Sequence, residues 1–145
     1  MRPHVVVLPS GFVVSDDRER IDMEFVHRAL SGAYWAAMRP RDLTVRAFGH
    51  SLCLGVYAPD GAQAGFGRAV TDYALRAHLA DFYVDPSRRG LGLGKALVET
   101  ILAHPELVTV GVWTLTTSDA QALYSRYGFR ASPSDPNSMT LRRNV

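Results

Sequence analysis

The chain is poor in cysteine and lacks long hydrophobic runs, and each absence excludes a class of protein. Its 145 residues contain one cysteine, Cys53, so an intrachain disulfide framework is excluded and a reducing compartment is favoured. Cys53 stands between two leucines, which is typical of a packed core thiol rather than a nucleophile. The first apolar run, residues 5–8, is followed by Pro9 and is too short for a signal peptide or a membrane span. We therefore expect a cytoplasmic protein with no membrane partner.

Runs of one charge are also missing. The 16 basic and 14 acidic residues give a net charge of +2 and are mixed along the chain. The longest basic runs are the pairs Arg88-Arg89 and Arg142-Arg143. Nucleic-acid-binding domains concentrate basic residues on one face or stripe. We therefore expect no nucleic-acid partner, although the isoelectric point is near 8.9.

Hydrophobic patterning predicts a single domain, residues 1–145, that belongs to the α/β class. Residues 1–11, with two prolines and a glycine, are expected to form an irregular N-terminal extension. About seven strands are expected in a mixed sheet, at residues 12–15, 51–57, 64–70, 78–84, 108–116, 129–130 and 139–142. About four flanking helices are expected at residues 22–30, 41–48, 91–103 and 119–126. A turn at residues 59–61 would join the second and third strands as a hairpin.

Three glycines alternate between the strand expected at 78–84 and the helix that follows it. They are Gly90, Gly92 and Gly94, and Arg89 precedes them. Glycine lets the backbone approach a ligand closely, and a helix N-terminus presents unpaired N–H groups and a partial positive charge. This segment therefore predicts a cradle for an anion, with a phosphate as the most suitable ligand.

The glycine spacing excludes two common phosphate-binding fingerprints. The Rossmann fingerprint would need a third glycine where Lys95 or Leu97 stands. The Walker P-loop would need Ser or Thr at Ala96 and glycine at Arg89. The spacing that remains is Arg-x-x-Gly-x-Gly, formed by Arg89, Gly92 and Gly94.

A second motif lies on the last expected helix, where Ala120, Leu123, Tyr124 and Tyr127 share one face. Periodicity alone predicts a core stripe with two tyrosines. The four residues from Ser118 to Gln121 also fit a capping box, in which the Ser118 hydroxyl would accept from the Gln121 amide.

Together the two motifs resemble those of the GNAT superfamily of N-acetyltransferases. Arg89, Gly92 and Gly94 are similar to its pyrophosphate-binding signature, and Ala120-x-x-Leu123-Tyr124-x-x-x-Gly128-Phe129 is similar to its C-terminal motif. The resemblance implies the GNAT fold, with a sheet splayed between the fourth and fifth expected strands at a bulge where the fourth strand ends, at Val84. It also implies acetyl-CoA as cosubstrate and no metal.

The resemblance further implies roles for individual residues. The Val84 amide would polarise the thioester carbonyl as an oxyanion-hole donor does, and Tyr124 would be the general acid. Thr117 stands where many members carry an asparagine that contacts the coenzyme. The coenzyme-binding residues implied in this way are Phe82, Val84, Arg89, Gly90, Leu91, Gly92, Leu93, Gly94, Lys95, Thr117 and Tyr124.

The general base is open among three candidates. Relatives place a base or an amine-binding acid where His78 and Asp81 stand, and Asp72 lies in the preceding loop. Strand alternation puts His78 and Asp81 on opposite faces unless the bulge intervenes, so they are expected to be rivals. Tyr34 and Trp35 are candidates for the acceptor pocket.

The expected function is acetyl transfer to the primary amine of a small molecule, directly within a ternary complex. One alternative is a protein or peptide N-acetyltransferase. Another is a non-catalytic acyl-CoA-binding domain, which would have no need of Tyr124 at the leaving group. A homodimer is also open, with Trp113 and the last strands as a candidate interface.

Overall fold

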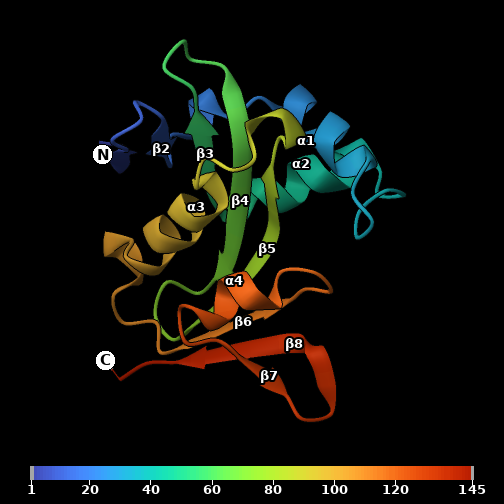
Figure 1. Cartoon of the computed structure of the whole chain (residues 1–145), viewed down its shortest axis with the longest axis vertical. Coiled ribbons are helices and arrows are strands. Elements are labelled where there is room, and N and C mark those ends of the chain that lie inside the picture. The colour runs from blue at the N-terminus through green and yellow to red at the C-terminus, as the bar shows by residue number, and fades with distance from the viewer. Residues whose placement is uncertain (1, 145) are drawn as a thin grey trace.

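A mixed sheet of eight strands forms the centre of the computed structural model, which describes residues 2–144 (Figure 1). The strands are β1 (Val5–Val7), β2 (Val13–Ser15), β3 (Leu52–Tyr57), β4 (Gln63–Thr71), β5 (Arg76–Val84), β6 (Val112–Thr116), β7 (Arg130–Ser132) and β8 (Asp135–Arg142). The helices are α1 (Met23–Ser31), α2 (Arg41–Gly49), α3 (Leu93–Leu102) and α4 (Gln121–Ser125). Three short 3₁₀ turns are η1 (Arg18–Arg20), η2 (Pro86–Arg88) and η3 (Pro105–Leu107). The predicted α/β class is confirmed.

The sheet opens between β5 and β6. Its strand order is β1-β2-β3-β4-β5-β6-β8-β7, and every neighbouring pair is antiparallel except β5 and β6. These two pair in parallel only at Arg76, Ala77 and His78 of β5. Beyond His78 the two strands diverge, and Figure 1 shows β8 and β7 lying across the lower end of the upright β4 and β5. The predicted splay is therefore confirmed.

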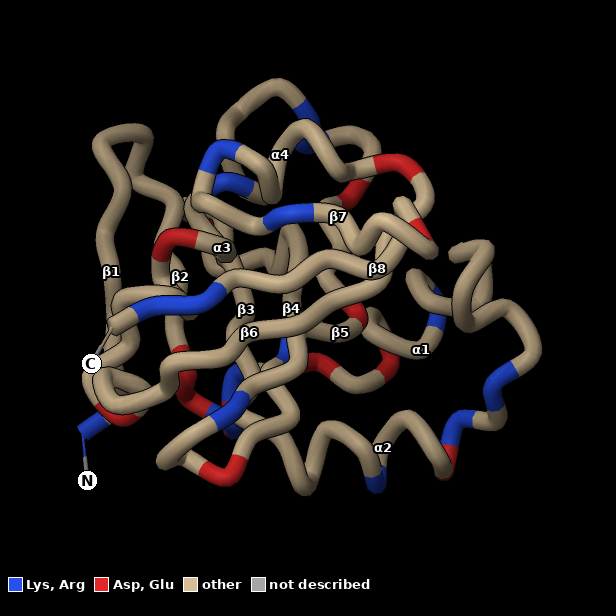
Figure 2. The backbone as a smooth tube through the Cα atoms, turned by 90° about the horizontal axis from the view of Figure 1, so that it is seen from below, with Lys and Arg blue, Asp and Glu red and all other residues tan. Residues whose placement is uncertain are grey.

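Each face of the sheet has its own core. Leu52, Leu54 and Val56 of β3 pack with α3 and α4 on one face, whereas Cys53 packs with α1 and α2 on the other. Alternate side chains of a strand point to opposite faces, so one strand serves both cores. Figure 2 shows the sheet between these two helical layers, with basic and acidic residues interspersed along the backbone.

Two expectations about buried residues have different outcomes. Cys53 is buried as predicted, and burial raises the pKa of its thiol to about 11. Trp113 was a candidate for a dimer interface, but its side chain is fully buried and donates to the Val110 carbonyl. It therefore offers no surface to a partner.

The N-terminal extension is more regular than predicted. Val5, Val6 and Val7 form β1 and pair with β2. The nearest prolines, Pro3 and Pro9, flank this strand rather than interrupt it, and three consecutive β-branched residues favour extended backbone. The final strand is also longer than expected, since β8 begins at Asp135 and not at Met139.

The predicted capping box is wrong. The amide of Ala120 donates to the Thr117 hydroxyl at 3.1 Å, so Thr117 satisfies the start of α4. Gln121 does not reach back to Ser118, because its side-chain amide donates to the Thr117 carbonyl and to Asn137. The helix is consequently shorter than expected and begins at Gln121.

Candidate active site

A β-bulge in β5 shapes the opening in the sheet. Phe66 pairs with Tyr83 and Arg68 with Ala80, so β5 has one extra residue between these pairs. Asp81 lies in the extra segment and has a positive φ of 56°. Gly67 faces the bulge, where an added Cβ would come within 2.7 Å of the Phe82 ring. The bulge therefore lies at Asp81 and Phe82 and not at Val84, the position that the resemblance implied.

Past the bulge, the Val84 amide faces the opening. The Asp85 amide donates to the Ala64 carbonyl at 2.8 Å, which makes Asp85 and Ala64 a hydrogen-bonded pair of the antiparallel ladder. Val84 and Gly65 are the next pair along, and such pairs alternate between bonded and non-bonded. The Val84 N–H thus points away from β4, towards the side where β6 has diverged.

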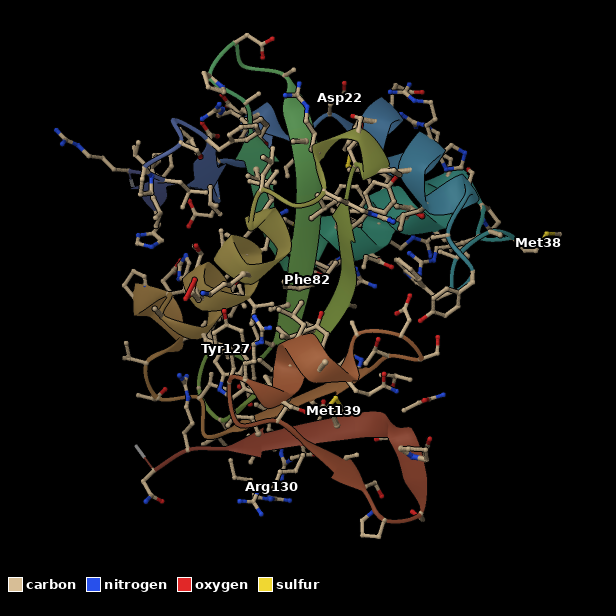
Figure 3. The ribbon with its side chains drawn as sticks, in the orientation of Figure 1. Asp22, Met38, Phe82, Tyr127, Arg130 and Met139 are labelled. Atoms are coloured by element: carbon tan, nitrogen blue, oxygen red, sulfur yellow. The ribbon has the colours of Figure 1, made fainter. Side chains whose placement is uncertain are left out.

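Two cavities meet at this opening, and each lies against a different helical layer. The α1-side cavity has a volume of about 340 Å³ and is bordered by the segment between α1 and α2, by β5 and by the β6–α4 loop. The α3-side cavity has a volume of about 140 Å³ and lies between β5, α3 and α4. Phe82, Ala120 and Tyr124 line both. Figure 3 shows Phe82 near the middle of the fold, between the two helical layers.

Tyr124 is buried at the junction of the cavities. Its ring makes an edge-to-face contact with Phe129, with the ring centroids 5.7 Å apart. Burial, and secondarily the negative charge of Asp119, raise the pKa of its phenol to about 12. The phenol therefore keeps its proton at neutral pH, but it is a weaker acid than an exposed tyrosine. Tyr127, in the turn that follows α4, is half-buried and packs against the core, as the periodicity of the sequence predicts.

Asp81 is held by four donors. Its carboxylate accepts from Trp35 Nε1 at 2.9 Å, from both terminal nitrogens of Arg39 at 2.8 and 3.1 Å, and from Arg68 Nε at 2.8 Å. Burial alone would raise the pKa of this carboxyl, but the hydrogen bonds from Arg39 and Arg68 outweigh it and hold the pKa below its usual range. An acid that is saturated with donors and firmly ionised is poorly suited to accept a proton.

His78 lies on the same cavity as Asp81, because the bulge cancels the strand alternation that would separate them. Its Nδ1 is 2.8 Å from the Thr114 hydroxyl of β6. Desolvation by the surrounding strands, and then the positive charge of Arg68, lower the pKa of His78 below its usual value of 6.5. The ring is therefore mainly neutral at pH 7, and in the tautomer whose Nδ1 donates to Thr114 its Nε2 can accept a proton.

The other candidate base, Asp72, lies away from both cavities. Its carboxylate accepts from the amides of Ala74, Leu75 and Arg76 and so closes the turn between β4 and β5. These hydrogen bonds lower its pKa. The geometry gives Asp72 a local structural role.

The glycine loop presents a row of free amides. Among residues 2–144, no group accepts a hydrogen bond from the backbone N–H groups of residues 90–95. Gly90 and Gly92 have positive φ angles of 83° and 75°, and an added Cβ at either would meet nothing within 4 Å. Arg89 is exposed beside them. Unpaired amides, open space and a cation fit the pyrophosphate of a coenzyme.

The remaining residues expected at the coenzyme divide by burial. Leu91 and Lys95 are exposed on the loop, whereas the Leu93 side chain is buried in the core, so Leu93 can offer only its backbone amide to a ligand. Thr117 is buried, lines the α1-side cavity, and uses its hydroxyl within the β6–α4 loop.

Sequence reasoning missed Arg39, Arg68 and Asn137. Asn137 lines the α1-side cavity from β8. Arg39 and Arg68 come from the segment after α1 and from β4, and only the fold brings them to Asp81. An acidic residue in an apolar strand, such as Asp81, indicates that a basic side chain pairs with it in the fold. The sequence has many arginines, however, and no local spacing selects Arg39 and Arg68.

One cluster outside the cavities has the composition of a metal site. Asp16, His104 and Glu106 offer ligand atoms within 4.8 Å of one another. However, Nε2 of the buried His104 is 2.7 Å from Asp16, and its Nδ1 accepts from the Glu106 amide. Both ring nitrogens are therefore occupied, and the cluster joins the start of η3 to the end of β2.

Among the described residues, no helix is long and apolar enough to cross a membrane.

Comparison with known proteins identifies the domain. A family model described as an acetyltransferase (GNAT) domain matches residues 50–131, more than half of the chain. A candidate GNAT acetyltransferase from Xanthomonas campestris pv. campestris has a similar crystal structure, with a TM-score of 0.79 and 42% identity over 92% of this chain and 89% of that one.

Two curated proteins are more distant. A soybean (Glycine max) protein named histone acetyltransferase TAP1 is 39% identical over 70 residues, which span 48% of this chain and 30% of the soybean protein. A candidate acetyltransferase of Gibberella zeae is 25% identical over 79% of this chain and 76% of its own length. The family model and the Xanthomonas structure agree with the two motifs and the splayed sheet, and the chain therefore belongs to the GNAT family of N-acetyltransferases.

Proposed function

We propose that this acetyltransferase moves the acetyl group from acetyl-CoA directly to the primary amine of a small molecule, with both substrates bound at once. The observation that carries the proposal is that Tyr124, Phe82 and Ala120 line both cavities. A donor in the α3-side cavity and an acceptor in the α1-side cavity would meet at the Tyr124 phenol. The α1-side cavity, at about 340 Å³, has the size of a small-molecule site.

The donor side is built from backbone groups. Acetyl-CoA, the donor that the family uses, would supply a thioester and a pyrophosphate. The free amides of residues 90–95, with Arg89, suit the pyrophosphate. The outward N–H of Val84 suits the thioester carbonyl, where a fixed donor stabilises the charge that develops on oxygen.

Proton transfer is divided between two side chains. His78, neutral at pH 7, accepts the proton that the amine loses, either directly or through a water molecule. Tyr124 delivers a proton to the departing sulfur from the opposite side. Asp81, saturated by Arg39, Arg68 and Trp35, instead holds the segment after α1 over the cavity.

Direct transfer agrees with the position of the cysteine. A double-displacement route needs a nucleophile on the protein to carry the acetyl group. Cys53 is buried on β3, lines neither of the two cavities, and has a pKa raised to about 11. It is therefore a poor acyl carrier.

The test is a thiol-release assay with acetyl-CoA over a panel of small amines, followed by initial rates at varied concentrations of both substrates. Intersecting double-reciprocal lines are expected for a ternary complex. Parallel lines would instead indicate an acyl-enzyme. If coenzyme A binds in calorimetry but no amine releases thiol, the proposed acceptor class is wrong.

A second candidate acceptor, a peptide, is favoured by one observation. Tyr34, Trp35 and Met38 expose apolar surface beside the α1-side cavity, and Met38 is 93% exposed. Figure 3 shows Met38 pointing away from the fold at the tip of this segment. A panel of short peptides with free N-termini or lysines, run in the same assay, separates this candidate from small amines.

A further inference from the structure

The wall of the α1-side cavity formed by Arg39 carries excess positive charge. Two guanidinium groups, Arg39 and Arg68, share the single carboxylate of Asp81. The Asp81 side chain is 1% exposed, so water screens its interaction with the two guanidinium groups only weakly. One positive charge remains uncompensated within the cluster.

Arg39 is the member of this cluster that can reach a ligand. Its side chain is 24% exposed, lines the cavity, and uses one hydrogen from each terminal nitrogen to bind Asp81. A guanidinium has five N–H donors, so three stay available. Arg68 is less exposed, does not line the cavity, and spends a second bond on the Ser51 hydroxyl. A planar cation with spare donors is suited to a carboxylate.

The lining of the same cavity also carries a negative charge. Asp119 lines the same cavity from the β6–α4 loop and is exposed. Among the described residues it forms no ion pair with a basic side chain. Tyr124 lines the same cavity as Asp119, and the negative charge of Asp119 contributes, after burial, to the raised pKa of the phenol. The cavity lining therefore carries a cationic group, Arg39, and an anionic group, Asp119, on two different segments of the chain.

We infer that the acceptor is an amine that also carries a carboxylate, as amino acids do, and that Arg39 binds this carboxylate. The ammonium group then lies in the cavity with Asp119, gives its proton to His78, the base of the proposed function, and attacks the thioester carbonyl as a neutral amine. This inference rests on the proposed function, because it names the acceptor class for the same cavity. Arg39 determines specificity here and takes no part in proton transfer.

The test compares matched acceptors in the thiol-release assay. Each set contains an amino acid, its amide and its decarboxylated amine, for example phenylalanine, phenylalaninamide and phenethylamine. Sets based on methionine, leucine and 4-aminobutyrate vary the side chain and the spacing between amine and carboxylate. The amide has the most acidic ammonium group, so it would rank first if amine ionisation alone set the order. We expect the amino acid to exceed both partners in kcat/KM by about tenfold or more in at least one set.

Variants then assign the effect to Arg39. Arg39→Gln should raise KM for the amino acid by about tenfold or more relative to KM for the decarboxylated amine, because loss of the Asp81 contact affects both acceptors and only the amino acid also loses the carboxylate contact. Arg39→Lys keeps the positive charge and can still pair with Asp81. It should therefore raise KM for the amino acid less than Arg39→Gln does. Arg41→Gln is the matched control, because Arg41 pairs with the exposed Glu24 and does not line the cavity. Thermal melting and coenzyme A binding show whether each variant keeps the fold.

The outcomes separate the inference from the proposed function. If amines without a carboxylate turn over as well as or better than the amino acids, or if Arg41→Gln has the same effect as Arg39→Gln, the inference is wrong while the proposed function stands. If coenzyme A binds and no small amine of any set releases thiol, the proposed function is wrong and the inference is overturned with it.

Discussion

The Tyr124 phenol keeps its proton far above neutral pH, since burial raises its pKa to about 12. If it donates that proton to the leaving sulfur, Tyr124→Phe should lower kcat by about a hundredfold or more, because general acid catalysis contributes on this scale. Binding of coenzyme A, measured by calorimetry, should change little, because only a hydroxyl is removed.

The matched control is Tyr127→Phe, three residues further along. Its side chain lines neither of the two cavities, so the loss of its hydroxyl should leave kcat unchanged. Equal losses in the two variants would contradict a specific role for Tyr124. Because the phenol stays protonated, Tyr124 should cause no alkaline decline in the wild-type rate below pH 10. Above pH 7 and up to pH 10, the pH profiles of the wild type and of Tyr124→Phe should therefore have the same shape.

His78 should set the acid limb of the pH profile. A base must be neutral to act, and desolvation together with Arg68 lowers the pKa of this ring below 6.5. Activity should therefore rise as pH increases through the pKa of His78, which lies below 6.5. Above that pKa, His78 should cause no further change in activity. The measurement is kcat/KM against pH for the wild type and for His78→Asn. The acid limb should be lost in the variant, whereas the rise that comes from ionisation of the acceptor amine should remain in both. If the acid limb persists in His78→Asn, a group other than His78 is the base.

At the scale of elements, the opening in the sheet depends on glycines of β4 that let β5 lie close. An added Cβ at Gly65 would come within 2.5 Å of the Tyr83 carbonyl oxygen, which belongs to the backbone and cannot rotate away. Gly65→Ala should therefore lower the free energy of unfolding by about 1–3 kcal/mol and displace the Val84 amide. Gly49→Ala, on α2, has open space around the added carbon and should be neutral or slightly stabilising. Urea denaturation of both variants checks the contrast, and equal stabilities would contradict it.

The cradle before α3 should bind coenzyme through Arg89 and not through its neighbour. Arg88 lies over the Phe12 ring, 5.7 Å from its centroid, while Arg89 is exposed beside the free amides. Arg89→Gln should weaken coenzyme A binding by about tenfold, the scale of a lost charged hydrogen bond. Arg88→Gln removes the same charge and should have a smaller effect. Calorimetry measures the coenzyme A affinity of both variants in parallel at two salt concentrations. This comparison distinguishes a direct contact of Arg89 with the coenzyme from a general loss of positive charge.

The elements that sequence predicted well are those with local signals. The cradle depends on the spacing of Gly92 and Gly94, and the helix that carries Tyr124 depends on the apolar stripe between Ala120 and Tyr127. Both patterns are local, so they could be recognised without knowing the fold. The bulge at Asp81 could not, because an extra residue in one strand shows only against its partner, β4. The start of α4 was also missed, since the side chain of Gln121 donates to the Thr117 carbonyl and to Asn137 of β8 instead of reaching back to Ser118.

At the scale of the whole molecule, Asp81 joins parts of the chain that are distant in sequence. Trp35 and Arg39 come from the segment after α1, Arg68 from β4, and the carboxylate itself from the bulge in β5. Tyr34 extends the same segment across the opening, where its hydroxyl accepts from the Ser118 amide. No sequence pattern encodes this connection, since its members are 13 to 46 residues apart from Asp81 in the chain and meet only in the fold. The cavity wall and the stability of the fold therefore share one ion cluster.

Replacing Asp81 removes the one carboxylate of that cluster. Asp81→Asn would leave two guanidinium groups without their carboxylate, and breaking a buried ion pair costs about 3–5 kcal/mol of unfolding free energy. Asp60→Asn is the control, because its exposed side chain accepts one amide bond that an asparagine oxygen can also accept.

The effect of Asp81→Asn should depend on pH in a fixed direction. The folded-state pKa of Asp81 lies below its ordinary value of 3.8, so the unfolded chain takes up the proton first. The stabilisation is complete above the unfolded value and is lost as pH falls through the folded one. The difference in unfolding free energy between wild type and Asp81→Asn should therefore be constant from pH 5 to 7 and shrink below pH 4. A difference that stays constant into the acid range would mean that the cluster is held by packing rather than by charge.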